Sequence, residues 1–228
     1  MTGRIESSGD VQVSTSQQRM SRVSLSTCNF TQLQLRVATP ILAGQDLHVN
    51  AISAFDTKFH RAAFVSILRL LDPSVTAVQA LILAPARDQA QRIYTEIRRE
   101  DFPGFRAHLC IGGTSVRETY ELLTKPGQHG AVHIIIGTVG RVEDLIRREI
   151  LKVDQLKVVF VDELDDIFGF RDLGLPLRSL FAALHRERLQ KIFFTITLIP
   201  ESRKFCEQML AKEHTMLRVG RDELRGDE

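Results

Sequence analysis

The chain has 228 residues, of which 43% are hydrophobic, and this allows one good-sized domain or two small ones. Its formal net charge of +2 is nearly balanced, so bulk charge indicates neither a nucleic-acid nor a membrane partner, and any basic surface has to be local. No apolar stretch approaches the length of a membrane span. Cys28, Cys110 and Cys206 lie far apart without metal-ligand spacing, which indicates reduced thiols in an intracellular protein, cytoplasmic or nuclear.

The two ends of the chain differ in composition from its middle. Residues 1–27 are rich in Ser and Gln and lack the apolar core of a secretory signal, so we expect a disordered tail there. A single domain is expected over residues 28–219. Residues 220–228 then form a C-terminal tail or the start of a linker to another domain.

From Phe30 onward, apolar runs alternate with amphipathic stretches. Strands are expected over residues 46–52, 79–85, 105–113, 130–138, 156–163, 191–197 and 215–219. Helices are expected over residues 61–72, 86–100, 115–124, 140–149, 175–187 and 200–213. Nearly continuous apolar strands separated by helices are typical of a parallel sheet with both faces covered. The sequence therefore predicts one α/β domain with a doubly wound, mostly parallel sheet.

Four carboxylates stand at the end of the apolar run "LKVVFVDELDDIF": Asp162, Glu163, Asp165 and Asp166. Ligands of open α/β sheets bind at the carboxyl ends of the strands, so these acids could form a metal–nucleotide site. The same acids would also suit the positive end of a following helix. Both explanations remain open at this point.

Five short strings occur in a meaningful order: "APARDQA", "IGG", "GTVGR", "VDELD" and "FFTIT". Together they resemble the first RecA-like domain of DEAD-box RNA helicases, in which the corresponding strings read APTRELA, GG, TPGR, DEAD and SAT. "CIGGTSVRE" and "LRVGRDEL" resemble the branch of eukaryotic translation initiation factor 4A and its nuclear relatives. The resemblance covers nearly everything after residue 28 and implies a fold of the P-loop NTPase type.

The resemblance also implies roles for single residues. In the family, the residue matched by Asp162 reaches Mg²⁺ through water, and the one matched by Glu163 orients the attacking water. The nucleotide-binding positions that the resemblance implies are Gln34, in a stretch resembling the family's Gln motif, and Lys58, Asp165, Thr195 and Thr197. We expect the hydroxyls of Thr195 and Thr197 to be hydrogen-bonded to Asp162 or Asp165. The alternative, purely structural explanation of Gln34 is that it is an exposed residue of a helix.

Other positions match the part of the family that contacts RNA: Arg87, Gly112, Gly113, Thr138, Gly140 and Arg141. Contacts of this kind are made to the RNA backbone, so they would be independent of sequence and weakened by salt. Two family residues are replaced here: Ala86 is found where the family has Thr, and Val139 where it has Pro. A solvated helix start explains Arg87 equally well, and an ordinary turn could explain the paired glycines.

The largest departure is in the phosphate-binding loop. The family pattern AxxGxGKT uses glycines, which let backbone N–H groups close around phosphate, together with a lysine and a hydroxyl. The corresponding stretch here, "NAISAFDTKFHRAAF", contains no glycine. One alignment places Thr57 and Lys58 at the Lys and Thr positions, and the other places His60 and Arg61 there. Two aromatic residues and an acid, Phe55, Phe59 and Asp56, would crowd or repel a phosphate.

We therefore expect a degenerate DEAD-box domain without ATPase activity of its own, which acts by binding RNA backbone weakly or by binding proteins. Helical-repeat scaffold proteins or a helicase partner are the proteins expected, and no membrane is. No cofactor is expected. One alternative is an ATP-dependent RNA helicase that uses Mg-ATP and a second RecA-like domain, and another is a pure protein-interaction module.

Overall fold

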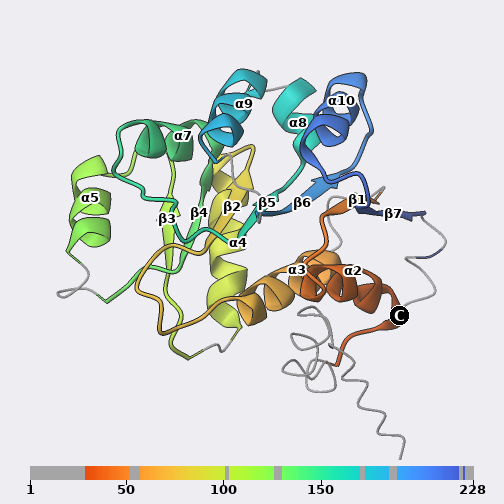
Figure 1. Cartoon of the computed structure of the whole chain (residues 1–228), viewed down its shortest axis with the longest axis horizontal. Helices are drawn as coiled ribbons and strands as arrows, with labels where there is room; N and C mark the ends of the chain where they lie inside the picture. Colours follow the sequence, from red (N-terminus) through yellow and green to blue (C-terminus); the bar gives the residue numbers. More distant parts are fainter. Residues whose placement is uncertain are drawn as a thin grey trace, which may run out of the picture.

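The computed structural model describes residues 29–51, 57–100, 103–125, 130–169, 173–184, 189–220 and 223. Seven strands form one sheet in the order β3-β4-β2-β5-β6-β1-β7, and every neighbouring pair is parallel (Figure 1). The strands are β1 (Leu47–Ala51), β2 (Ala80–Ala84), β3 (Ala107–Cys110), β4 (Ile134–Thr138), β5 (Val158–Val161), β6 (Gln190–Thr195) and β7 (Thr215–Val219). The doubly wound α/β fold is thus confirmed, whereas the expected tail over residues 1–27 lies outside the described residues.

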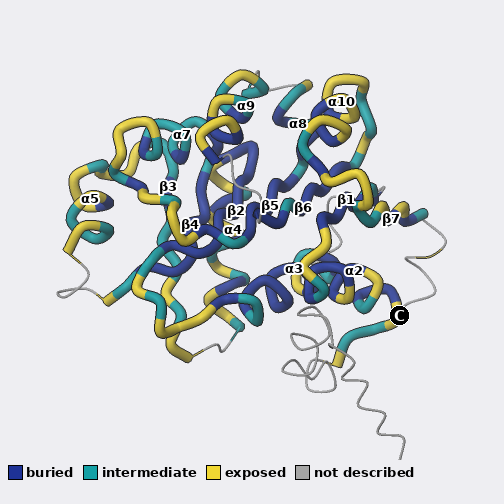
Figure 2. Tube along the Cα trace, viewed as in Figure 1, coloured by how far each residue is buried: buried dark blue, intermediate teal, exposed yellow. Residues whose placement is uncertain are grey.

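The central strands are apolar along their whole length because both of their faces are covered. Every residue of β2 and of β5 is buried. Successive side chains of a strand point to opposite faces, so Phe160 joins one hydrophobic core while Val159 and Val161 join the other. In Figure 2 the strands accordingly run as a buried band through the middle of the molecule, with exposed segments on the outer helices.

The helices form two layers, one on each side of the sheet (Figure 1). The first layer consists of α2 (Gln32–Leu42), α3 (Thr57–Leu70) and α4 (Arg87–Arg99), whose apolar faces share a core with the sheet. The second consists of α7 (Val139–Arg147), α8 (Leu164–Gly169), α9 (Gly174–Ala183) and α10 (Pro200–Met209). Helix α5 (Val116–Thr124) packs its half-buried apolar residues against the second core, near the β3 edge. None of the described helices is long and apolar enough to cross a membrane.

Two helices depart from the sequence-based expectation. Helix α2 was not expected as an element of the fold and contains Pro40, yet Val37 and Ile41 are fully buried and Thr31 closes its start with a capping box. Helix α3 begins at Thr57, four residues before the expected start. Residues 52–56, which include Phe55 and Asp56 of the divergent loop, lie outside the described residues.

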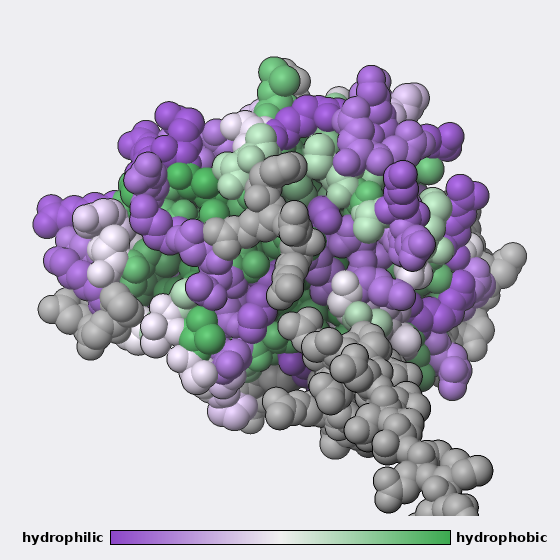
Figure 3. Space-filling view, in the orientation of Figure 1, coloured by the Kyte–Doolittle hydropathy of each residue, from purple (hydrophilic) through white to green (hydrophobic). Residues whose placement is uncertain are grey.

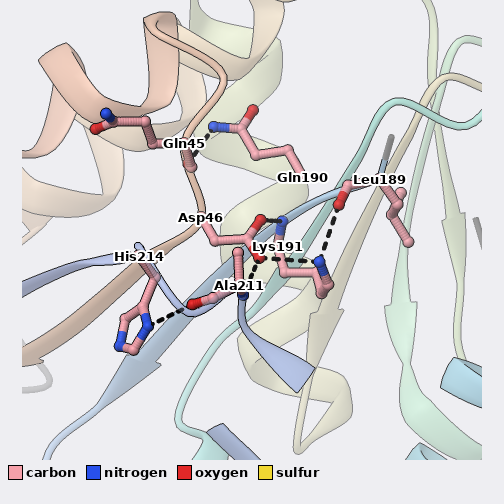
Figure 4. Close-up of polar contacts among 7 residues, drawn as sticks. All are labelled: Gln45, Asp46, Leu189, Gln190, Lys191, Ala211 and His214. Carbon is pink, nitrogen blue, oxygen red and sulfur yellow. Dashed lines mark hydrogen bonds and ion pairs between the residues drawn. The ribbon is translucent and has the colours of Figure 1, made fainter. Parts of the chain in front are cut away.

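At the amino ends of the strands, the buried carboxylate of Asp46 joins three segments (Figure 4). It accepts hydrogen bonds from the backbone N–H of Lys191, at 2.8 Å, and from that of Ala211, at 2.9 Å. The Lys191 ammonium also lies 2.9 Å from its second oxygen. Asp46 therefore ties the starts of β1 and β6 to the turn before β7, the strand at the edge of the sheet.

We predict that Asp46→Ala lowers the free energy of unfolding by roughly 3 kcal/mol, because it leaves a half-buried ammonium and two backbone N–H groups without their acceptor. Urea unfolding followed by circular dichroism measures the change. Glu213→Ala removes an exposed acid from the same turn and serves as the control. Equal stability of the two variants would contradict this role for Asp46.

Candidate nucleotide and RNA site

Asp162 lies directly after β5, where the sheet presents its carboxyl ends, and only 5% of its surface is exposed. Its Oδ1 atom lies 2.8 Å from Nε2 of His60, a residue of α3 that is 102 positions away in the chain. The same oxygen accepts the backbone N–H of Glu163 at 3.1 Å. The first carboxylate of the "VDELD" string is therefore engaged by the protein itself.

His60 stands in an aromatic enclosure. Its ring centroid lies 5.2 Å from that of Phe194, 5.8 Å from that of Phe64 and 6.2 Å from that of Phe160. These rings fix the orientation of the imidazole and screen its contact with Asp162 from water. Of the two loop alignments, the contact favours the one that places His60 at the family's lysine position.

Glu163, the second acid of the string, is also held by the chain. Its carboxylate accepts a hydrogen bond from the side-chain amide of Gln89, which lies in α4. Burial, and after it the negative charge of Asp162, raises the pKa of Glu163 above its ordinary value. Its backbone has φ = 43°, a left-handed conformation that costs a non-glycine residue about 1–3 kcal/mol. Sequence reasoning missed Gln89, although it replaces the apolar Leu of the family string.

The last matched acid, Asp165, is a structural anchor. Its two oxygens accept the backbone N–H groups of Ile196, at 3.1 Å, and Thr197, at 2.8 Å. The expectation that the threonine hydroxyls bond to these acids was wrong for Thr195. Its hydroxyl instead lies 3.0 Å from Nε2 of His48 and accepts the side-chain amide of Asn50 at 3.1 Å, because β1 is the direct neighbour of β6 in the sheet.

The remaining positions of the expected nucleotide site are partly built into the fold. Gln34 is buried rather than exposed, because its amide oxygen accepts the N–H of Thr31 and its amide nitrogen donates to the carbonyl of Lys58. Both Lys58 and Phe59 belong to α3. Phe59 is only 2% exposed and packs in the core, so the expectation that its ring crowds the phosphate pocket was wrong.

Groups of the protein itself already contact one of the two oxygens of Asp162. Because His60 and the backbone N–H of Glu163 both contact Oδ1, a metal-bound water would have to compete with them for that oxygen. Among the described residues, no group of three or more His, Cys, Asp or Glu side chains is placed to hold a metal ion. Cys110 and Cys206 are buried, and burial raises the pKa of each thiol to about 12, so neither is a reactive thiolate.

A cavity of about 440 Å³ lies at the carboxyl ends of β2, β3 and β4. We call it the arginine groove. It brings together segments that are far apart in the sequence, and five of the six positions expected to contact RNA line it: Arg87, Gly112, Thr138, Gly140 and Arg141. Gly113, the sixth, lies next to Gly112 and beneath the Arg87 guanidinium.

Both arginines of the groove lie against the turn after β3. A Cβ atom at Gly112 would lie 2.7 Å from Nη2 of Arg87, so a side chain at this position would displace the guanidinium. Arg141 donates a hydrogen bond to the carbonyl of Thr114 at 3.1 Å. The groove also contains Asp144, whose carboxylate is neutralised by Arg147 and Arg148, and the hydrogen bond from Arg148 lowers its pKa. The groove therefore offers two arginines, one of which, Arg141, is held by a backbone carbonyl.

The sequence matches the family described as DEAD/DEAH box helicase over residues 31–205. Eukaryotic initiation factor 4A-1 of Arabidopsis thaliana is 35% identical over 196 residues, which cover 84% of this chain and 44% of that protein. The ATP-dependent RNA helicase eIF4A of Mycosarcoma maydis is 35% identical over 195 residues, again 84% of this chain and 44% of that protein. The chain belongs to the DEAD/DEAH box helicase family and spans somewhat less than half the length of these relatives.

Solved structures show the same fold. A DEAD box protein from Methanococcus jannaschii superposes with a TM-score of 0.72 at 16% identity, covering 92% of this chain and 55% of that one. S. cerevisiae Dbp5 bound to RNA and ADP BeF3 superposes with a TM-score of 0.67 at 18% identity, covering 85% of this chain and 47% of that one. These likenesses confirm a RecA-like domain of the DEAD-box type.

We predict that His48 makes the stability of the domain depend on pH. Burial, aided by the positive charges of His214 and Arg218, lowers the pKa of His48 from 6.5 to about 4. Between these two pH values His48 binds a proton in the unfolded chain but stays neutral in the folded chain. The stability due to neutral His48 is present above pH 6.5 and is lost as the pH falls towards 4. Between pH 7 and 4.5 the loss is about 2 kcal/mol.

The measurement is the free energy of unfolding in urea at both pH values, for the wild type and for His48→Gln, which keeps a hydrogen-bond donor near Thr195. The variant should lose less stability on acidification by about that amount. Identical losses in both proteins would show that His48 is not responsible.

Proposed function

We propose that this domain is a DEAD-box unit whose nucleotide site is closed by its own side chains and which acts by binding RNA backbone. The contact between His60 and Asp162 is the observation that carries the proposal, because it engages the carboxylate that the family uses to reach magnesium. The glycine-free loop supports the same conclusion, since it lacks the residues that let a backbone wrap a phosphate chain.

The contact imposes an energetic penalty on nucleotide binding. A hydrogen bond to a charged group contributes about 1.5–3 kcal/mol, and Mg-ATP has to break this one before it can use Asp162. That free energy corresponds to a loss of roughly ten- to hundredfold in affinity. This loss adds to the affinity that is lost because the loop has no glycines.

A thermal melt with and without Mg-ATP tests the closed site. A domain that bound Mg-ATP with a Kd of about 10 µM would gain about 2.7 kcal/mol at about 1 mM nucleotide and melt roughly 5–10 °C higher. We expect no such rise for the wild-type chain. A rise of that size would contradict the proposal and favour the enzyme.

The competing candidate is an ATP-dependent RNA helicase that works with a second RecA-like domain. Asp162 and Glu163 are both retained, and Asp165 is anchored on the end of β6, so the acids of this site remain in place. The relative from Mycosarcoma maydis is described as an enzyme of this kind. The same melt separates the two candidates, because the helicase has to bind Mg-ATP.

RNA binding is assigned to the arginine groove. Its two guanidinium groups and the helix start at Val139 face a single cavity, and helix N-termini and arginines are donors that suit phosphate. The contacts would be to the sugar–phosphate chain, so binding should not depend on base sequence. Protein partners are a further part of the proposal, since solved Dbp5 complexes include one with Gle1.

We predict that Arg141→Glu abolishes binding of single-stranded RNA at low salt, because it replaces a phosphate donor with a negative charge. Arg141→Gln should weaken binding and reduce the slope of log K against log salt by about 0.7, the value for one phosphate contact on a single strand. Fluorescence anisotropy at several salt concentrations measures both effects.

Arg203→Gln, which changes an exposed arginine of α10, is the control and should leave binding unchanged. Absence of RNA binding by the wild type at low salt would remove the RNA assignment. That outcome would favour the protein-interaction module.

A further inference from the structure

Another cavity lies at the amino ends of β3 and β4, whereas the arginine groove lies at their carboxyl ends. It has a volume of about 460 Å³ and is formed by the last turn of α4, the segment leading into β3 and the start of β4. Three arginines line it: Arg98 and Arg99 from the helix, and Arg106 from the segment before β3. We call it the arginine pocket.

All three arginines of this pocket are exposed to solvent. Among the described residues, none of them takes part in an ion pair, whereas seven other arginine and lysine side chains do. The pocket's own acid, Glu100, is already bound by Arg61 through two contacts of 2.8 and 3.5 Å. The charge of Arg99 also acts on Glu96, so among the described residues the three arginines around the cavity are only partly balanced by acids.

Helix electrostatics explain only part of this arrangement. Arg98 and Arg99 stand in the last turn of α4, where cations complement the helix dipole. Arg106 belongs to no helix, and its side chain comes from a separate segment to the same cavity. Three like charges that converge from two segments repel one another, and an anion bound between them would relieve that repulsion.

The walls of the pocket favour such an anion. Arg98 lies over the ring of Tyr94, with its guanidinium carbon 5.7 Å from the ring centroid, which limits the freedom of the side chain. Ile97 and Ile134 also line the cavity, but both are almost fully buried, so its accessible lining is mainly polar. On the face of the molecule drawn in Figure 3, hydrophilic side chains cover α5 and α10, neither of which lines this pocket.

We propose that the arginine pocket binds a small polyphosphate, meaning a compound with a chain of two or more phosphate groups. Guanidinium forks match phosphate oxygens in geometry and bind them with paired hydrogen bonds. An anion with one carboxylate would neutralise a single arginine, whereas a polyphosphate matches all three charges. The cavity falls within the range of volumes that hold small molecules.

The experiment is isothermal titration calorimetry with tripolyphosphate in the absence of divalent metal, on the full chain. We expect saturable binding to the wild type, and about tenfold or weaker affinity for the Arg98→Gln/Arg106→Gln double variant. Arg106→Gln alone should weaken binding several-fold, which keeps the test decisive if the double variant does not fold. Arg117→Gln, an exposed arginine of α5, should bind as the wild type does.

Absence of binding to the wild type would overturn the proposal. So would unchanged affinity in the Arg98→Gln/Arg106→Gln variant, or an equal loss in Arg117→Gln. Loss in Arg141→Glu with retention in the double variant would place the ligand in the arginine groove and would also overturn it. The proposal does not depend on the closed nucleotide site, which the Mg-ATP melt tests separately.

Discussion

The contact between His60 and Asp162 fixes the first acid of the "VDELD" string against α3. It joins the start of α3 to the end of β5, so it spans the place where a DEAD-box domain would hold the phosphates and the metal of a nucleotide. The aromatic rings around His60 keep water from competing with the contact. A buried carboxylate needs a partner, and here the partner is a side chain of the protein.

The carboxyl edge of the sheet is divided into two parts with different properties. On the nucleotide side, functional positions are bonded to the chain itself, as with Gln34 to Lys58 and Glu163 to Gln89. At the positions expected to contact RNA, Arg141 is held by a backbone carbonyl and Arg87 lies against the paired glycines, and both line an open cavity. The two parts thus differ in how far their side chains are bonded within the chain, and the proposed binding role starts from this contrast.

Much of the fold could be predicted from the sequence, because buried parallel strands produce apolar runs that are easy to recognise. The runs around Ile82, Ile136 and Phe160 each became a strand of the sheet. Helix α2 was not predicted because its stability comes from packing and because Pro40, a residue that is rare inside helices, interrupts the helical pattern of the sequence. The positions expected to contact RNA line one cavity because their strings follow neighbouring strands. The contact between Gln89 and Glu163 was not predicted, although the polar residue at a position where the family has Leu was a signal for it.

The sequence alone determined the alternation of strands and helices, the order of the motifs and the absence of glycine from the phosphate loop, because these are properties of local composition. Only the tertiary structure decided which residue meets Asp162, which atoms hold Thr195 and where Phe59 points. Those outcomes depend on the order of strands in the sheet, which brings together residues more than a hundred positions apart. Sequence spacing carries no information about such distances, so the identity of each partner became visible only in the folded chain.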